Sequence, residues 1–184
     1  MTSALHIQVA RLEAIYDLTA AISQPLTLRE IYDVALDCVE CALRPDRCAI
    51  AVLDAQGVMR FCAWRNLPLS YRRVAEGHSP WPLDAIRPLP IVIPDAMEAP
   101  ELAAVRDEIR RAGIRTIAFV PLLERERLIG KLVLYFHRVR PLALDEIELA
   151  QTIAHHVAIA IDRSRHEVEL LTRDRAIRAA PHGI

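Results

Sequence analysis

Two apolar runs joined by a short charged connector constrain the fold of this chain most strongly. The first run is Thr116–Leu123 and the second is Leu128–His137, both rich in Ile, Val, Leu, Phe and Tyr. Runs of this length, bounded by charged and turn residues, are typical of β-strands and are too short to cross a bilayer as helices. The connector at 124–127 has the length of a hairpin loop, so we expect the two runs to pair antiparallel in the middle of a sheet. Gly130 marks a bend or the close approach of a neighbouring backbone.

Further segments predict the other strands and the helices. Arg47–Leu53 and Val58–Arg65 predict a first hairpin, and Ile91–Ile93 predicts a short strand. The prolines on both sides of Ile91–Ile93 favour an edge position, because proline cannot donate a hydrogen bond to a neighbouring strand. Periodicity and capping signals predict an N-terminal helix that ends before Pro25, a helix that begins at the capping box Thr27–Glu30, and helices over Leu69–Glu76, Glu101–Arg111 and Leu144 to about Leu171.

Strand alternation assigns side chains to the two faces of the first hairpin. Ala49 and Ala51 leave one face of the first strand lined by small side chains. In the returning strand the same alternation places Phe61 and Ala63 on one face and Trp64 on the other.

Length and charge limit the class of protein. With 184 residues the chain is long enough for one domain with a substantial core and extensions. Its net charge of −1 argues against a general nucleic-acid binder, which would carry a basic excess. No apolar run is long enough to span a bilayer, and the N-terminus lacks the pattern of a signal peptide. We therefore expect a cytoplasmic protein that binds no nucleic acid and has no membrane segment in this chain.

The sequence contains no motif of a known catalytic or metal centre. Nucleophile elbows, Walker loops, HExxH and GxGxxG are all absent, so we expect no catalytic residues. The four cysteines lie within apolar patterns and are predicted to be reduced, buried residues rather than zinc ligands; they are Cys38, Cys41, Cys48 and Cys62. His78 and His137 could share one site, which leaves a metal or redox sensor as an alternative.

The first and last helices carry apolar stripes that predict self-association. The first helix has two adjacent stripes, Leu5, Val9, Leu12, Tyr16 and Thr19 on one and Ile15, Leu18 and Ile22 on the other. The last helix has strictly alternating steps of three and four, typical of a coiled-coil seam, at Ile147, Ala150, Ala154, Val157, Ile161, Ser164, Val168 and Leu171. We therefore predict a parallel homodimer held through Leu5–Ile22 and Ile147–Leu171.

Four segments, taken with their order and spacing, resemble the C-terminal half of a GAF domain, a small-molecule sensory module. They are Phe119-Val120-Pro121-Leu122, Leu128–Leu132, Asp145–Leu149 and Ala154–Ile161. The resemblance implies an α+β fold: a GAF/PAS-like central antiparallel sheet of five or six strands, with the N- and C-terminal helices packed on one face. It also implies that Asn66–Gly113, here called the cover segment, folds over the other face.

The resemblance implies a division of the chain and a function. Residues 1–24 would form a signalling helix, 25–165 the GAF domain, and 166–184 a linker whose end resembles the start of a PAS domain. The expected function is ligand sensing in a multidomain signalling protein of the sensor histidine kinase or cyclic-di-GMP enzyme type, relayed through a dimeric helix bundle. The alternative is a degenerate GAF domain that binds nothing small and only supports dimerisation.

Comparison with GAF subclasses points to no particular ligand or cofactor. Of the signature of the cyclic-nucleotide-binding members, only Lys131, Asp145 and Glu146 could correspond, and Leu142 stands where a Phe is expected. The bilin-binding members have a Cys-His pair, which this chain lacks, so we expect no visible chromophore. The cover segment contains none of the cysteines that the methionine-sulfoxide reductase members require.

The equivalent segment of GAF domains forms a pocket wall, so we predict a ligand site between the cover segment and the sheet. The predicted lining residues are Trp64, Tyr71, His78, Trp81, Asp95 and Tyr135. Aromatic walls with a few polar groups are typical of small-molecule sites. The alternative is that Trp64 and Trp81 only fill the space left by the small side chains of Ala49, Ala51 and Ala63.

Overall fold

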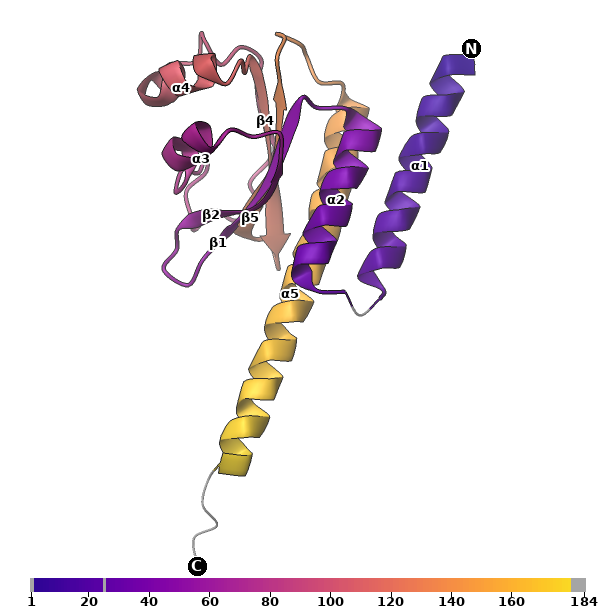
Figure 1. The fold of residues 1–184 in the computed structure, drawn as a ribbon, viewed down its shortest axis with the longest axis vertical. Helices are drawn as coiled ribbons and strands as arrows, with labels where there is room; N and C mark the ends of the chain where they lie inside the picture. Colours follow the sequence, from indigo (N-terminus) through magenta and orange to yellow (C-terminus); the bar gives the residue numbers. More distant parts are fainter. Residues whose placement is uncertain (1, 25, 180–184) are drawn as a thin grey trace, which may run out of the picture.

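One five-stranded antiparallel sheet, in the order β2-β1-β5-β4-β3, forms the centre of the computed structural model, which describes residues 2–24 and 26–179 (Figure 1). The strands are β1 Arg47–Leu53, β2 Met59–Arg65, β3 Ile91–Ile93, β4 Thr116–Glu124 and β5 Arg127–Phe136. The helices are α1 Thr2–Ile22, α2 Leu28–Leu43, α3 Leu69–Ala75, the 3₁₀ helix η1 Pro100–Val105, α4 Arg106–Arg111 and α5 Leu144–Ala179. The predicted α+β class and the edge position of β3 are confirmed.

The predicted central hairpin is confirmed, with a tighter turn than expected. Glu124 pairs with Arg127, so only Arg125 and Glu126 form the turn, with φ of 45° and 74°. Two central residues with positive φ are the mark of a type I′ turn, whose twist matches that of paired strands. Gly130 allows β1 to approach closely, because a Cβ there would lie 2.5 Å from the carbonyl oxygen of Ala51.

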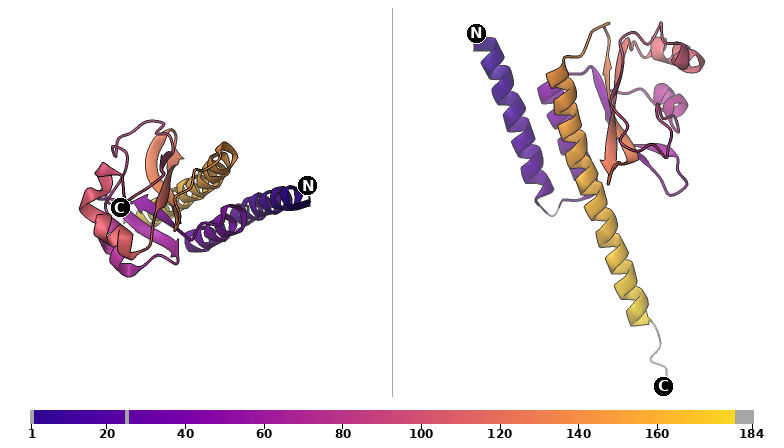
Figure 2. Two further views of the ribbon diagram at one scale, coloured as in Figure 1. Left: turned by 90° about the horizontal axis from the view of Figure 1, so that it is seen from above. Right: turned by 180° about the vertical axis from the view of Figure 1, so that it is seen from behind.

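The elements form layers on the two faces of the sheet. Helices α2 and α5 pack against one face, and α1 packs outside them against α2 and α5, so that these two separate it from the sheet (Figure 2). The cover segment, with α3 and α4, lies on the opposite face (Figure 1). The predicted capping box begins α2, since Thr27 Oγ1 accepts from Glu30 N and Glu30 Oε2 accepts from Thr27 N. No helix within the described residues is long and apolar enough to cross a membrane.

Each face of the sheet has its own apolar cluster. On the helix side, Ile50 and Leu132 pack among side chains of α2 and α5. On the cover side, Ala49, Val133 and Tyr135 pack against α3, η1, α4 and the loops between them. The expected alternation in β1 is therefore confirmed, with its small residues toward the cover segment.

The expected alternation in β2 is wrong, because a β-bulge interrupts it. Ile50 pairs with Ala63 while Ala51 pairs with Phe61, which leaves Cys62 as the extra residue. Ala63 consequently lies in the helix-side cluster, whereas Phe61 packs against the cover-side cluster. A bulge puts one additional residue into a strand and so reverses the faces of everything beyond it.

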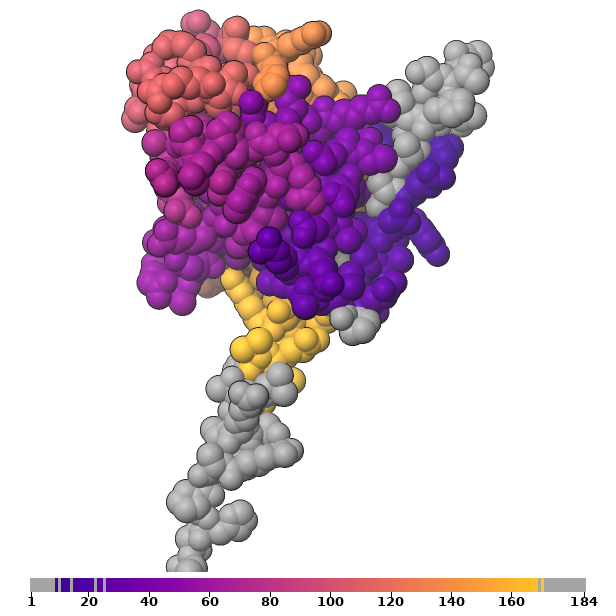
Figure 3. All heavy atoms as spheres, in the orientation of Figure 1, coloured from indigo at the N-terminus to yellow at the C-terminus, as the bar shows by residue number. Residues whose placement is uncertain are grey.

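The predicted coiled-coil seam of α5 is wrong over its first half, because those residues belong to the core of their own domain. Ala150, Ala154, Val157 and Ile161 are fully buried in the helix-side cluster. After the contacts of Arg163 and Arg165 with the domain, α5 projects away from it (Figures 1 and 3). The seam residue Val168, on the projecting part, is exposed. The side chain of Leu171 lies outside those that the structure describes.

Helix α1 has one buried and one exposed apolar side. Leu18 is buried and Ile15 packs against the helix-side cluster, whereas Leu12 is 67% exposed and Tyr16 is 74% exposed. The expectation of two distinct apolar sides therefore agrees with the structure at these positions. The side chains of Leu5 and Ile22 lie outside those described.

Candidate functional site

The structure brings four of the six predicted pocket residues together on the cover side of the sheet. Tyr71, Trp81 and Tyr135 belong to one apolar cluster, and the ring of His78 lies 6.5 Å from that of Phe119 in the same cluster. Tyr71 comes from α3, His78 and Trp81 from the loop that follows it, and Tyr135 from β5. Residues from the cover segment and from the central sheet therefore meet here.

The other two predicted residues lie at the two edges of the sheet. Trp64 is on the edge strand β2, 38% exposed, with the guanidinium of Arg72 at 3.7 Å from its ring. Asp95 follows the opposite edge strand β3, and its carboxylate accepts a hydrogen bond from Arg115 Nη2 at 2.6 Å. That bond lowers the pKa of Asp95. Trp64 and Asp95 thus flank the central group on opposite sides.

Tyr71 and Tyr135 form a buried pair. Their rings meet edge to face with centroids 5.5 Å apart. Burial raises the pKa of Tyr71 to about 12 and holds that of Tyr135 well above its usual value. Both side chains therefore remain neutral phenols at physiological pH.

Trp81 fixes the loop that crosses the sheet. Its indole Nε1 donates to the carbonyl of Leu89 at 2.9 Å, and its ring meets that of Phe119 edge to face at 6.4 Å. The hydroxyl of Ser79 donates to the carbonyl of Trp81 at 2.8 Å. Trp81 is 8% exposed, so both its apolar body and its polar atom have partners inside the protein.

Lys131 also belongs to this group of residues, although it was not among the predicted pocket residues. It lies in the middle of β5, opposite Ala51 of β1 and Pro121 of β4, and is only 3% exposed. Its Nζ donates to the carbonyl of His78 at 2.5 Å and lies 5.4 Å from the ring centre of Phe119. Burial lowers the pKa of Lys131 to about 8. The small side chain of Ala51, its neighbour across the strands, leaves room for the lysine on the cover side.

A signal for Lys131 was present in the sequence. It is the only lysine among the 23 Lys and Arg residues of the chain, and it interrupts a strand of otherwise apolar residues. Lysine and arginine are not equivalent, because the ammonium is a compact point charge whose pKa shifts readily on burial. A chain that uses arginine at every other basic position and lysine here has a distinct chemical group at the centre of its sheet.

Thr116 connects the cover segment to the start of α5. Its buried hydroxyl donates to the carbonyl of Pro94 at 2.7 Å and accepts from the backbone N–H of Arg140 at 3.0 Å. The guanidinium of Arg140 in turn pairs with Glu146 in the first turns of α5 at 2.5 Å and stacks on Phe136. A short set of contacts thus joins the end of β3 to the last helix.

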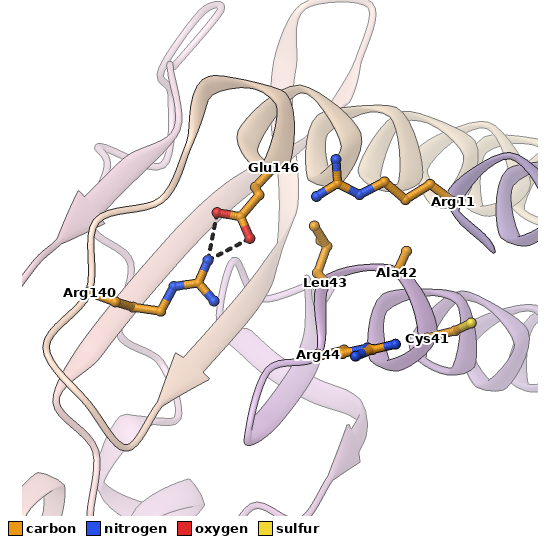
Figure 4. Close-up of a pocket in the computed structure, with 7 residues that line it drawn as sticks. All are labelled: Arg11, Cys41, Ala42, Leu43, Arg44, Arg140 and Glu146. Atoms are coloured by element: carbon orange, nitrogen blue, oxygen red, sulfur yellow. Dashed lines mark hydrogen bonds and ion pairs between the residues drawn. The ribbon is translucent and has the colours of Figure 1, made fainter. Parts of the chain in front are cut away.

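A hollow of about 190 Å³ marks the same junction on the helix side. It is lined by Arg11, Cys41, Ala42, Leu43, Arg44, Arg140 and Glu146. In Figure 4 Arg11 of α1 lies on one side and the Arg140–Glu146 pair on the other. Arg11 also pairs with Asp145 at 2.5 Å, so ion pairs hold the beginning of α5 to both α1 and the preceding loop.

The two histidines that could have shared one site have different neighbours in the structure. The carbonyl of His78 contacts Lys131, whereas His137 lies past the end of β5, where its ring contacts Arg47 and Asp46. His137 comes six positions after Lys131, which along an extended chain corresponds to about 20 Å. Within the described part of the chain no group of three or more His, Cys, Asp and Glu side chains is placed to hold a metal ion.

The cysteines are free, and three of them are at least partly buried as predicted. Burial raises the pKa of Cys38 and of Cys48 to about 12, so neither forms a thiolate at neutral pH. Cys62, at the bulge, is half-buried. Cys41 differs from the prediction, because it lies on the exposed side of α2.

Comparison with known proteins identifies the family. The GAF domain family matches residues 27–161. A domain of a protein assigned as a two-component sensor histidine kinase from Sinorhizobium meliloti 1021 is 37% identical, with 77% of this chain and 95% of that chain covered and a TM-score of 0.72. No curated protein matches this chain.

Two more distant structures share the fold. The GAF domain of a phosphoenolpyruvate-protein phosphotransferase from Coxiella burnetii is 20% identical, with coverages of 88% of this chain and 98% of that one and a TM-score of 0.71. A phycocyanobilin-bound GAF domain from a cyanobacterial phytochrome is 19% identical, with coverages of 85% and 96% and a TM-score of 0.65. The family match covers most of this chain, and the 37% sequence identity to the Sinorhizobium meliloti domain is higher than a shared fold alone would require. This chain therefore belongs to the GAF domain family.

Proposed function

We propose that this GAF domain is a non-catalytic sensory module of a cytoplasmic signalling protein. It binds a small molecule between the sheet and the cover segment and relays occupancy through α5 to an output domain. The relative at 37% identity is assigned as a sensor histidine kinase, which supports a kinase as the output. The observation that carries the proposal is the position of Thr116, whose one hydroxyl contacts both the cover segment and the loop that begins α5.

The relay requires that a change in the cover segment alters contacts at the start of α5. Movement of Pro94 would break or strengthen its bond to Thr116, and the same hydroxyl accepts from Arg140. Arg140 holds Glu146 of α5 through two short hydrogen bonds. A ligand biases such a system only by its differential affinity for the two arrangements, so the contacts must differ between them.

A double-mutant cycle tests the relay without knowledge of the ligand. Trp81→Ala loosens the cover segment, and amide hydrogen exchange reports on residues 144–150 at the start of α5. We expect faster exchange there in Trp81→Ala than in the unmodified protein. In a protein that already carries Thr116→Val, adding Trp81→Ala should not increase the exchange rate further. Equal effects of Trp81→Ala in both backgrounds would contradict a route through Thr116.

We further propose that the protein acts as a homodimer through the exposed side of α1 and the projecting part of α5. The exposed side of α1 carries Val9, Leu12 and Tyr16, and the projecting part of α5 carries Val168 and Leu170. The 18 residues after Ile161, given that α5 ends at Ala179, would extend about 27 Å beyond the core. Arg163 and Arg165, close to Ile161, still contact the domain through the carbonyls of Gln24 and Leu53. A largely exposed helix is marginal in water, so a second helix is the natural partner for the exposed apolar side chains farther along.

Light scattering at micromolar concentration tests the dimer. The unmodified chain should have the mass of two copies, and Leu12→Glu with Tyr16→Glu should shift it toward one. Leu89→Glu, on the exposed cover segment, is the matched control and should leave the mass unchanged. A monomer for the unmodified chain would contradict the proposal.

A second candidate function is a GAF domain that binds nothing small and serves only as a dimerisation element. The burial of Tyr71, Trp81 and Tyr135 favours it, because these side chains fill the space between sheet and cover segment. Native mass spectrometry of freshly purified protein separates the candidates, since it reports the number of copies and any retained small molecule together.

A further inference from the structure

Lys131 is a buried ammonium without a carboxylate partner among the described residues. One acceptor, the carbonyl of His78, contacts its Nζ, so two of its three N–H bonds have no acceptor in the part of the chain that the structure describes. Removing a charge from water is unfavourable unless an opposite charge or sufficient hydrogen bonds compensate it. The positive charge of Lys131 therefore has no compensating negative charge among the described residues.

The groups around Lys131 are aromatic and uncharged. Phe119 faces the ammonium, and Trp81 and His78 pack on Phe119. Burial, and secondarily the charge of Lys131, lowers the pKa of His78, so its ring is neutral at physiological pH. An occupant of this place must carry an anionic end for the lysine and an apolar body for the rings.

We propose that Lys131 anchors the carboxylate of a small aromatic or alicyclic carboxylic acid between the sheet and the cover segment. This inference rests on the proposed sensory function and names the chemical class of its ligand. The carboxylate accepts two hydrogen bonds from Nζ, and the ring of the acid packs against Phe119 and Trp81.

A phosphate group fits this place less well than a carboxylate. Phosphate has three strongly accepting oxygens and a charge near −2, which proteins usually meet with arginines or several free backbone N–H groups. The nearby backbone donors are already used: Gly77 N bonds to Met59, His78 N to Ala75, and Trp81 N to Ser79. The single positive charge of Lys131 therefore matches the single negative charge of a carboxylate better than that of a phosphate.

Binding would also move the cover segment. The carbonyl of His78 already accepts one N–H bond of Nζ, so a carboxylate that accepts the other two comes to lie beside it. Repulsion between the two acceptors then pushes the carbonyl and its loop away. Ser79 and Trp81 are bonded to each other and would shift together with His78. The close approach of the carboxylate to this carbonyl thus couples occupancy to the position of the loop that crosses the sheet.

Because Lys131 is the only lysine, it can be observed alone by NMR. Protein labelled with ¹⁵N-lysine should give one Nζ signal, titrated without ligand and with 10 mM benzoate, cyclohexanecarboxylate or indole-3-acetate. We expect at least one of these acids to bind and to raise the pKa of Lys131 above its ligand-free value of about 8. Benzamide, which has the ring without the charge, should do neither.

Affinity should also depend on pH and on the lysine itself. Binding of the acid should weaken by about tenfold between pH 7 and pH 9, because the fraction of protonated amine falls by that factor around a pKa of about 8. The other titratable group that contacts this site, His78, is neutral over the whole range. Lys131→Met should lose at least tenfold in affinity, whereas Arg87→Met, an exposed basic residue of the same segment, should bind as before.

The outcomes separate this inference from the proposed function. Failure of all three acids to bind, or equal affinity in Lys131→Met, would overturn the assignment of a carboxylate ligand. If native mass spectrometry then reveals a neutral molecule retained by the protein, the sensory function stands and only the ligand class is wrong. If neither acids nor a retained molecule bind, the dimerisation-only alternative is favoured.

Discussion

Replacing Trp81 by alanine distinguishes a side chain that supports the fold from one that only lines a mobile wall. Trp81 is almost fully buried, contacts Phe119 and donates its indole N–H to Leu89. Burial of roughly 200 Å² at about 25 cal/mol/Å² corresponds to about 5 kcal/mol as an upper value. The carbonyl of Leu89 adds little to the cost, because this residue is exposed and water can replace the indole.

We therefore expect Trp81→Ala to reduce the free energy of unfolding by about 3–5 kcal/mol. Urea unfolding followed by circular dichroism measures this free energy. Tryptophan fluorescence is less suitable, because the variant lacks one of the two tryptophans. Trp64→Ala is the matched control and should cost about 2 kcal/mol or less, because Trp64 is partly exposed at the sheet edge. If both variants lose equally little free energy of unfolding, Trp81 does not contribute to the core, and the loop that carries it is easily displaced from the sheet.

Three further predictions follow from buried charge, core packing and turn geometry. Lys131→Met should stabilise the protein by about 3 kcal/mol below pH 8, because folding lowers the pKa of the lysine from 10.5 to about 8 and burial of the protonated form is unfavourable. Urea unfolding should show that this gain disappears between pH 8 and 10.5. A gain that stays constant over this pH range would contradict the prediction. Val157→Glu should unfold the domain, at a cost of several kcal/mol, because Val157 packs in the core of its own domain. If circular dichroism and light scattering instead show a folded monomer, Val157 belongs to a subunit interface. Replacing Arg125-Glu126 by Asn-Gly should raise the free energy of unfolding by about 0.5–1 kcal/mol, because both positions have positive φ, and no gain in thermal or urea unfolding would contradict the turn type.

Short-range patterns were sufficient for most of the secondary structure. The strands β1, β4 and β5 lie within a residue of their predicted ends, and α2 begins at its capping box. Such features are encoded locally, because apolar alternation, turn residues and caps act over a few neighbouring positions. The bulge at Cys62 was not predictable in this way, since the extra residue in β2 becomes evident only when the strand is paired with β1.

The apolar pattern of α5 shows the limit of periodicity. Steps of three and four indicate that one side of a helix is covered, but they do not identify the covering element. From Ala150 to Ile161 that element is the domain's own sheet and α2. The same ambiguity applies to α1, where the sequence predicted two apolar sides and the fold decided that Leu18 faces inward and Tyr16 faces outward.

The sequence by itself determined the GAF fold, the order of its elements and the group of aromatic residues that meets on the cover side. Only the tertiary structure decided which polar atoms are isolated from water, because burial depends on segments far apart in the chain. Lys131 lies within an apolar strand, and its ammonium is enclosed only once the loop containing His78 crosses β5. Thr116 likewise acquires its two partners only when the end of β3 and the loop before α5 meet beside β4.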